Sequence, residues 1–475
     1  MKRFCLVAAI SLLAVGGLLR FKLVARASPQ EAREARTVSE STVPRLVVGG
    51  SENATYTENA ESSFDAETDA AEVNRELPTD LPPPMQIQIW WGVGGHLGEA
   101  FEKQVARFNE SHERVVVKIR SLAGYGGVYR ELKKAFETGD LPDAAVVEIH
   151  QIASFAAENQ IKPLDGFIKD DQAFQGDDLL AGMLTNLRYR DRLYALPLNR
   201  STPILYYNKK RFAEAGLDPS KPPETWQQVR EKSRALTSVD GNRYGFLPWN
   251  SPWIFESMVW SGGGEWMVGK KATFAEPGAK SLQLWADMVH RDKTARYGLD
   301  PISEFTEGRA AMVIESTAWV QWLASECGFE LGTAFLPSFE GFKHAVPTGG
   351  GAAVIPTAIS AERQAAAWAF LTWFISTTQA AEWSRTMGYI PVRESARTLL
   401  RTEGFYHDHP AFETAIEQME YAREAPMLQR WPAAWKIIAD AMNSIVGNDA
   451  SAVETLKSAE EKVDVLLNAE TDQQP

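Results

Sequence analysis

The sequence predicts an α/β protein with a mainly parallel sheet and a helical C-terminal part. Three observations support this class. Apolar stretches typical of strands alternate with amphipathic helical stretches over residues 85–148, as in right-handed βαβ units. The last third carries large apolar residues at helical spacing, as in 362–375 and 452–467. The 475 residues exceed the roughly 250–300 at which a single core stops growing, so two or three folding units are expected.

The N-terminal elements follow from the spacing of their apolar residues. Strands are expected at 85–91, 114–120 and 141–148, and helices at 99–109 and 129–139. Gly-rich loops follow the first two strands. In such sheets ligands lie at the carboxyl ends of the strands, and four residues are expected there. They are Trp90, Trp91, Tyr125 and Glu148.

A polar break interrupts two apolar strands at the centre of the chain. Residues 194–198 and 203–207 are apolar, and Asn199-Arg-Ser-Thr202 lies between them. Polar side chains between two strands can face a cleft, although an ordinary β-turn gives the same pattern. A short helix is expected at 209–216, ending at Gly216.

Composition excludes several functions. The net charge of −13 argues against nucleic acid or an anionic membrane as the main partner. Gly92-x-Gly-Gly and Gly124-x-Gly-Gly lack the dinucleotide spacing, and no Walker lysine follows either. The only two cysteines, Cys5 and Cys327, have no metal or redox spacing. We therefore expect no cofactor, no metal and no structural disulfide.

The first 84 residues are expected to stand apart from the folded body. Residues 1–27 have a basic start and an apolar run, which predicts an export signal or an N-terminal membrane anchor. Residues 28–84 hold 12 acids against four arginines and few large apolar side chains, which predicts a disordered acidic linker. The expected location is therefore periplasmic or extracytoplasmic. A tether to the membrane and a leader with no further role both remain open.

Several motifs resemble those of the extracellular solute-binding proteins, family 1, of ABC importers. They include Ala135-Phe-x-Thr-Gly139-x-x-Pro-Asp, Ser201-Thr-Pro-Ile-Leu-Tyr-Tyr-Asn-Lys, Gly308-Arg-Ala-Ala-Met312 and Gly388-Tyr-Ile-Pro391. Their order and spacing are similar to the branch that binds sn-glycerol 3-phosphate and sugars. The resemblance covers essentially everything from residue 86 onward.

The resemblance implies a two-lobed fold of the periplasmic-binding-protein type II. Crossover strands near 199–203, 314–317 and 351–355 would form a hinge. Residues 85–200 with 316–352 would make the N-terminal lobe, and 201–315 with 353–475 the C-terminal lobe. Such a protein is expected to be a monomer that closes over a sugar, polyol or glycerol phosphate and presents it to the transmembrane subunits of an ABC permease.

The resemblance also implies eight ligand-binding positions. Hydroxyls, backbone N–H groups, an aromatic face and an arginine fork would together satisfy a polyol or a phosphate. Each position also has a structural alternative, such as a core aromatic or a helix cap. The eight are Tyr125, Glu148, Ser201, Trp249, Ser316, Gly350, Tyr389 and Arg430.

Two departures from the family pattern bear on the ligand. Arg200 precedes the hinge serine and adds a possible anion contact. Five tryptophans are expected on the pocket side, which suits a sugar or a glycerophosphodiester with a bulky head group as well as glycerol 3-phosphate. They are Trp90, Trp91, Trp249, Trp253 and Trp260.

Three functions compete at this point. The first is the substrate-binding component of an ABC uptake transporter, which performs no chemistry. The second is a tethered sensor that presents its closed form to a signalling receptor. The third is a carbohydrate-active enzyme using Glu148 and Glu315, which would need carboxyl groups about 5–9 Å apart. No nucleophile elbow or histidine-based metal motif supports the enzyme.

Overall fold

A computed structural model describes residues 84–471 of the chain. These residues belong to one compact unit, Phe64–Pro475. The other unit, Met1–Ser63, lies outside the described residues. So do the expected export signal at 1–27 and all but the last residue of the expected linker. Within the described range, none of the helices combines the length and apolar character that a membrane crossing requires.

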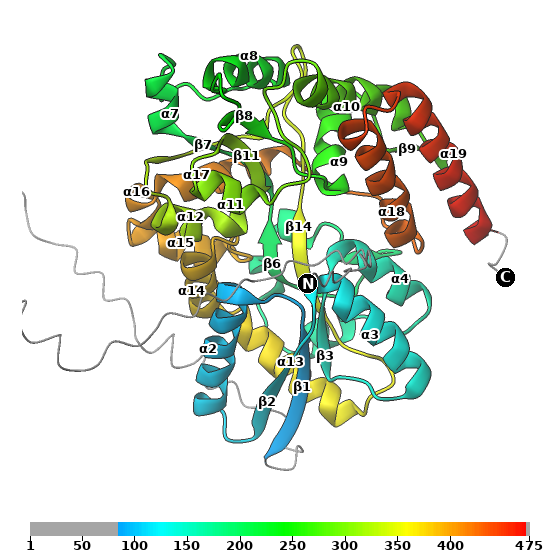
Figure 1. Cartoon of the computed structure of the whole chain (residues 1–475). Helices are drawn as coiled ribbons and strands as arrows, with labels where there is room; N and C mark the ends of the chain where they lie inside the picture. The colour runs from blue at the N-terminus through cyan, green and yellow to red at the C-terminus, as the bar shows by residue number, and fades with distance from the viewer. Residues whose placement is uncertain (1–83, 472–475) are drawn as a thin grey trace, which may run out of the picture. The chain divides into compact units, whose positions relative to one another are not determined.

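A five-stranded sheet organises what we call the first lobe (Figure 1). Its strand order is β2-β1-β3-β14-β6. β1 is parallel to β2 and β3, whereas β14 is antiparallel to β3 and β6. The strands are β1 (Met85–Trp91), β2 (Val115–Ser121), β3 (Ala144–Glu148), β6 (Leu196–Ser201) and β14 (Gly349–Val354).

The first two helices join the parallel strands as the sequence predicts, but both begin earlier than expected. They are α2 (Gly95–Ser111) and α3 (Gly124–Thr138). Glycine weakens a helix, so a pattern of propensities places these starts too late. Helix α3 ends at Gly139 in the left-handed conformation, with φ of 84°. Tyr125 therefore lies in the first turn of a helix and not in a loop.

A four-stranded sheet organises the second lobe, with strand order β12-β7-β11-β8. β7 is antiparallel to β11 and β12, and β11 is parallel to β8. Every residue of β7 is buried, which explains its continuous run of large apolar side chains. The strands are β7 (Pro203–Asn208), β8 (Tyr244–Leu247), β11 (Ala310–Ser316) and β12 (Leu331–Ala334).

Helices cover both sheets, and short elements connect them (Figure 1). Those between β3 and β7 are η1 (Ile149–Gln151), α4 (Ile152–Ala157), α5 (Asp165–Asp170), η2 (Gly176–Asp178), α6 (Ala181–Leu184) and the hairpin β4 (Arg188–Tyr189) with β5 (Arg192–Leu193). Those between β7 and β12 are α7 (Lys209–Glu214), α8 (Trp226–Leu236), α9 (Pro252–Ser261), β9 (Met267–Val268), β10 (Lys271–Ala272), α10 (Ala275–His290), α11 (Pro301–Thr306), η3 (Thr317–Trp319) and α12 (Val320–Glu326).

The last part of the described chain is strongly helical, as predicted. After β13 (Val346–Pro347) and β14 come α13 (Ala361–Phe374), α14 (Thr377–Met387), α15 (Glu394–Thr402), α16 (Phe405–Asp408), α17 (Pro410–Glu417), η4 (Gln418–Tyr421), β15 (Ala422–Arg423), α18 (Trp431–Met442), η5 (Asn443–Gly447) and α19 (Ala452–Thr471). The expected core helix at 362–375 and closing helix at 452–467 correspond to α13 and α19.

Three apolar clusters hold these layers together. One fills the face of the first sheet under α2 and α13 and continues to one face of the second sheet. Another fills the other face of the second sheet under α9, α10, α18 and α19. The third packs α3 and α4 on the remaining face of the first sheet. Because the first cluster touches both sheets, the two lobes share part of their core.

The chain crosses between the lobes where the polar break was predicted. β6 ends at Ser201 in the first sheet, and β7 begins at Pro203 in the second. The backbone N–H of Thr317 donates to the carbonyl of Thr202 (3.0 Å), and that of Ile390 to the carbonyl of Arg200 (2.8 Å). Segments distant in sequence therefore lie side by side at the junction of the lobes.

Sheet membership differs from the expected lobe boundaries in two places. Residues 316–352 were expected in the N-terminal lobe, but β12 within them pairs with β7 of the second sheet. Residues 353–475 were expected in the C-terminal lobe, but α13 contacts β1 and α2 of the first. The sequence of a helix shows that one face is buried without showing which sheet buries it, and β12 has only four residues.

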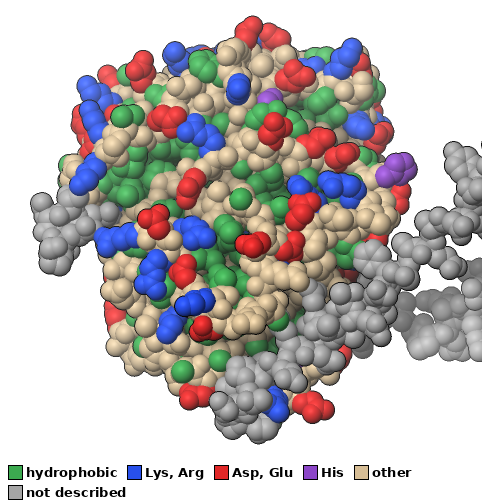
Figure 2. Space-filling model, turned by 180° about the vertical axis from the view of Figure 1, so that it is seen from behind, with side chains coloured by type: hydrophobic (Ala, Val, Ile, Leu, Met, Phe, Trp, Pro, Cys, Tyr) green, Lys and Arg blue, Asp and Glu red, His purple; other side chains and the backbone are tan. Residues whose placement is uncertain are grey.

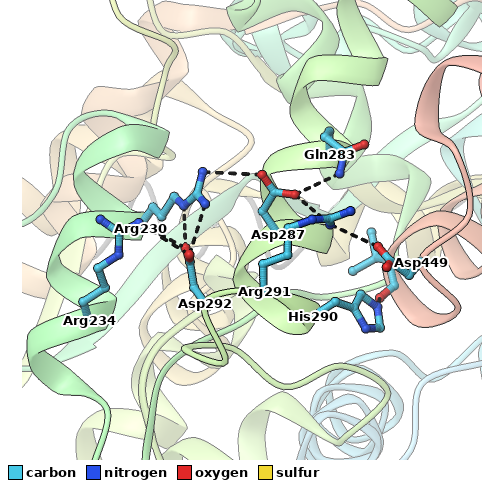
Figure 3. Close-up of polar contacts among 9 residues, drawn as sticks. Arg230, Arg234, Gln283, Asp287, His290, Arg291, Asp292 and Asp449 are labelled. Atoms are coloured by element: carbon cyan, nitrogen blue, oxygen red, sulfur yellow. Dashed lines mark hydrogen bonds and ion pairs between the residues drawn. The ribbon is translucent and has the colours of Figure 1, made fainter.

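Polar networks tie helices of the second lobe together at its surface (Figure 3). Arg230 on α8 pairs with Asp292 (2.5 Å) and Asp287 (3.6 Å), and Arg291 pairs with Asp287 and Asp449. Hydrogen bonding to Arg230 lowers the pKa of Asp292. On the face seen in Figure 2, acidic and basic side chains are interspersed. Such partly exposed pairs contribute little stability individually.

Candidate functional site

A cavity of about 410 Å³ lies where the two sheets meet. The carboxyl ends of β3, β6 and β11 and the beginning of β14 reach it. The first turn of α3 completes its wall on the first lobe, and α9 and α18 complete it on the second. A polar site at the carboxyl ends of strands is where open α/β sheets bind ligands.

Seven of the eight predicted ligand positions line this cavity. They come from segments separated by up to 264 residues (Tyr389 less Tyr125), so the fold assembles them. Arg430 is not among the lining residues; it is the N-cap of α18, whose Pro432 and Trp435 do line the cavity. The seven are Tyr125, Glu148, Ser201, Trp249, Ser316, Gly350 and Tyr389.

Two tyrosine hydroxyls meet in the cavity wall. The hydroxyls of Tyr125 and Tyr389 lie close enough to influence each other's pKa, and the Tyr125 hydroxyl accepts from the side-chain amide of Asn199 (3.1 Å). The Trp383 indole N–H donates to the carbonyl oxygen of that amide (3.1 Å), which fixes its orientation. Burial raises the pKa of Tyr125 to about 12 and raises the pKa of Tyr389 well above its ordinary value, so both hydroxyls remain neutral donors and acceptors.

Glycines bring the backbone of β14 close to neighbouring groups. Gly350 has φ of +98°, and a Cβ there would lie 1.7 Å from the carbonyl oxygen of Asn199. A Cβ at Gly349 would lie 2.5 Å from the Trp253 ring. Only glycine allows this approach, so the sequence Gly349-Gly-Gly351 serves the cavity wall through its lack of side chains.

Glu148 and Ser316 each have a local structural role as well. The Glu148 carboxylate accepts from the backbone N–H of His150 (3.1 Å) and caps η1. The Ser316 hydroxyl accepts from the N–H of Ala318 (3.2 Å) and caps η3. The structural alternative considered for Ser316 is therefore realised, while both side chains still face the cavity.

Aromatic side chains form much of the wall. Trp249 packs edge-to-face on Trp253, with ring centroids 6.1 Å apart, and the Trp253 indole donates to the carbonyl of Thr348 (3.1 Å). Trp319 and Trp435 also line the cavity. Rings with apolar faces and polar edges suit ligands that carry both characters.

Three of the five tryptophans expected on the pocket side lie elsewhere. Trp91 stacks on Phe101 in the core, with centroids 3.9 Å apart. Trp90 and Trp260 are buried beneath the guanidinium groups of Arg120 and Arg423. Trp90 and Trp91 end a strand whose last three residues are all buried, so the period-two alternation does not separate pocket from core there.

Arg200 does not line the cavity, although the sequence indicated a possible anion contact. Its guanidinium donates to the carbonyls of Gly349 (3.3 Å) and Thr185 (3.1 Å) and to the Thr348 hydroxyl (2.7 Å). Burial lowers the pKa of Arg200 to about 10. Its charge is thus used to hold the backbone at the junction of the lobes.

Sequence reasoning missed several lining residues, among them His150, Gln151, Ser251, Trp319 and Trp435. His150 and Gln151 directly follow Glu148, and Trp319 follows Ser316 by three residues. Their proximity to predicted positions was a usable signal. Trp435 lies in an amphipathic helix and gives no such signal.

The pair of acids considered for an enzyme is not assembled in the cavity. Glu148 lines it, whereas Glu315 does not. The Glu315 carboxylate accepts from the backbone N–H of Ser316 (2.8 Å), and burial raises its pKa to about 8. Glu315 is therefore buried in the protein and does not line the cavity that Glu148 lines.

Two α/β lobes joined by crossover strands, with a polar and aromatic cavity between them, define a hinged solute-binding protein. The model of the bacterial extracellular solute-binding protein family matches residues 103–414. The chain belongs to this family. Its members are the non-enzymatic substrate-binding components of ABC importers, and they deliver small molecules to permease subunits.

Relatives and solved structures agree with this assignment. The sn-glycerol-3-phosphate-binding periplasmic protein UgpB of Pectobacterium atrosepticum is 26% identical over 422 residues, covering 82% of this chain and 92% of that protein. UgpB of Yersinia pestis is 28% identical over 359 residues, covering 70% and 80%. The structure of UgpB from Mycobacterium tuberculosis in complex with glycerophosphocholine has a TM-score of 0.75 at 26% identity, covering 82% and 99%. The two-lobed fold predicted from the sequence is thereby confirmed.

Proposed function

We propose that this chain captures a sugar, a polyol or a glycerol-phosphate-like solute in the cavity between its lobes and releases it unchanged to a permease. The observation that supports this most is the assembly of Tyr125, Ser201 and Tyr389 hydroxyls beside the Trp249 face in one cavity. Hydroxyl groups satisfy the polar atoms of a polyhydroxyl solute, and the indole covers its apolar face.

The charges at the cavity favour a solute with little net negative charge. Among the described residues that line the cavity, Glu148 and His150 alone carry ionisable carboxyl, amino, guanidinium or imidazole groups. A phosphate group gains most from a planar arginine fork, and Arg430 beside the cavity is the arginine proposed for that role. Neutral sugars and polyols, and phosphodiesters with one negative charge, are therefore preferred over a phosphomonoester.

The wider arrangement follows from the family. The relatives named above are periplasmic proteins, and we infer an extracytoplasmic location for this chain, with the N-terminal segment as its export signal or tether. The protein would act as a monomer that presents its closed form to the permease. In this proposal the lobe boundaries follow sheet membership and not the ranges expected from the sequence.

The direct test is a binding panel with four probes: sn-glycerol 3-phosphate, glycerophosphocholine, maltose and ribitol. The full chain is expected to bind at least one of them, to change its tryptophan fluorescence on binding because four tryptophans line the cavity, and to return the probe chemically unchanged. Calorimetry gives the affinity, and mass spectrometry of the recovered probe detects turnover. A hydrolysed probe would contradict the proposal.

The variant Arg430→Ala resolves the role of the arginine within the same panel. If Arg430 pairs with phosphate, its loss weakens the two phosphate-bearing probes and leaves maltose and ribitol unchanged. The matched control is Arg423→Ala, because Arg423 is a half-buried arginine that pairs with Glu265 outside the cavity. Equal weakening of all four probes by Arg430→Ala would remove the phosphate role.

A further inference from the structure

Three titratable side chains join the two lobes at the cavity. Glu148 ends β3 and His150 lies in η1 of the first lobe, whereas Glu256 lies on α9 of the second. The Nδ1 atom of His150 is 2.5 Å from Glu148 Oε1, and its Nε2 atom is 3.5 Å from Glu256 Oε1. One imidazole ring therefore bridges two carboxylates from opposite lobes.

The burial of this group requires that its charges compensate each other. The side chains of His150 and Glu256 are 2% and 0% exposed, and that of Glu148 is 24% exposed. Among the described residues, neither carboxylate oxygen of Glu256 has a hydrogen-bond partner. A buried carboxylate without a compensating charge is strongly unfavourable. Burial raises the pKa of Glu256, and His150 is the neighbouring group that opposes this rise.

The second lobe also contacts the ring through another element. Trp435 on α18 packs on the imidazole of His150, with centroids 4.4 Å apart, and α18 contacts η1. Trp435 and His150 both line the cavity. A displacement of one lobe against the other therefore changes the surroundings of His150 directly.

The distances from the His150 ring to the two carboxylates differ, and this difference bears on closure of the lobes. A charge-assisted N–H···O bond has a length of about 2.7–2.9 Å. The contact with Glu148 is fully formed, while that with Glu256 is longer than such a bond by a fraction of an ångström. The longer contact is the one that crosses between the lobes, and hinge closure is the motion that shortens distances across a cleft.

We propose that His150, as an imidazolium, is a positioning residue for solute binding: it holds the Glu148 carboxylate at the cavity and completes its bond to Glu256 when the lobes close. This rests on the proposed function, because it takes Glu148 as a contact of the solute. A Glu148 side chain held in one position accepts hydrogen bonds from solute hydroxyls, so this arrangement favours polyhydroxyl solutes. The solute and the bridge then stabilise the same closed form.

A purely structural role for His150 would require different groups. The capping of η1 uses the backbone N–H of His150 and requires neither a charged ring nor Glu256. Among the described residues, no group of three or more histidine, cysteine or acidic side chains is arranged to hold a metal ion. Protonation of the ring and dependence on Glu256 therefore separate the proposal from a structural role.

The protonation of the His150 ring depends on the groups that face it. These are Glu148, the last residue of β3, and Glu256 on α9. Arg200 on β6 in turn interacts with Glu148. Burial lowers the pKa of His150, but the two carboxylates outweigh burial and raise it to about 10. Because this pKa lies above the ordinary value of 6.5, the bridge contributes its full stabilisation below pH 6.5. The contribution is lost as the pH rises through about 10.

The test uses the full chain, its variants His150→Gln and Glu256→Gln, and the double variant. Nitrogen chemical shifts of His150 report its protonation without any solute, and calorimetry with maltose and glycerophosphocholine reports affinity from pH 6 to 10. We expect the His150 ring of the wild type to be protonated at pH 7–8. The His150→Gln variant should bind the probes about tenfold more weakly, and its affinity should not decline at alkaline pH as that of the wild type does. Glu256→Gln should move the His150 titration to lower pH, and the two substitutions should not be additive.

The control His290→Gln removes a histidine whose ring bonds the carbonyl of Val446 outside the cavity, and it should leave affinity unchanged. A neutral His150 ring at pH 7 overturns the proposal. So does a Glu256→Gln variant with an unchanged His150 titration, even if His150→Gln does not fold. If the wild type binds no probe, the proposed function loses its support, and the solute-free titration still decides on the bridge.

Discussion

Replacement of Gly350 by alanine is expected to lower the free energy of unfolding by about 3–5 kcal/mol and to remove solute binding. The residue has φ of +98°, and the new methyl group would lie 1.7 Å from the carbonyl oxygen of Asn199. That oxygen belongs to the backbone of β6, which pairs with β14 at this point, so no side-chain rotation relieves the overlap. Urea unfolding followed by fluorescence measures the loss.

The matched control for this prediction is Gly298→Ala. Gly298 also has a positive φ, of 78°, but an added Cβ would meet nothing within 4 Å. Its substitution carries backbone strain alone, about 1–2 kcal/mol, and should leave binding intact. Equal losses of stability in the two variants would show that the backbone of β14 does not approach Asn199 as described.

Replacement of Trp249 by alanine is expected to weaken binding of the preferred probe about 30-fold, or roughly 2 kcal/mol, while changing stability little. Trp249 lines the cavity and is only half-buried in the protein, so most of what its ring gains comes from the solute. A core tryptophan would give the opposite result. Calorimetry of the variant with the panel measures the effect.

Trp249→Phe is the matched control, because it keeps an aromatic face packed edge-to-face against Trp253. It should recover most of the affinity. An alanine variant with wild-type affinity would mean that the solute does not contact this face. An alanine variant that loses stability instead would show that Trp249 belongs to the core.

The sequence predicted the fold well where each element follows from local pattern. Alternation in β1 and the glycine stop after α3 are local properties, and the structure confirms both. Residues 331–334 form a strand only because β7 offers them a partner. Whether α13 packs on the first or the second sheet is likewise decided by tertiary contacts, which propensity does not contain.

In the candidate site, too, residues marked by a local motif could be predicted, and residues brought together by tertiary contacts could not. Ser201 and Gly350 could be placed because motifs at strand ends mark where the lobes meet. His150 and Trp435 could not be paired, because they are 285 residues apart in sequence (435 less 150) and meet only when α18 packs against η1. Arg200 was considered as a possible anion contact because a basic residue beside a binding motif suggests an anion, and its bonds to backbone carbonyls appear only in three dimensions.

The central claim is that the two lobes close over a solute, and a distance measured between them tests it most directly. Spin labels would be attached at Lys118 on β2 and Glu231 on α8, both exposed and on opposite lobes, with Cys5 and Cys327 replaced by serine. Addition of the probe that binds most tightly should shift the distance distribution to a single narrow population. An unchanged distribution with the probe bound would contradict hinge closure.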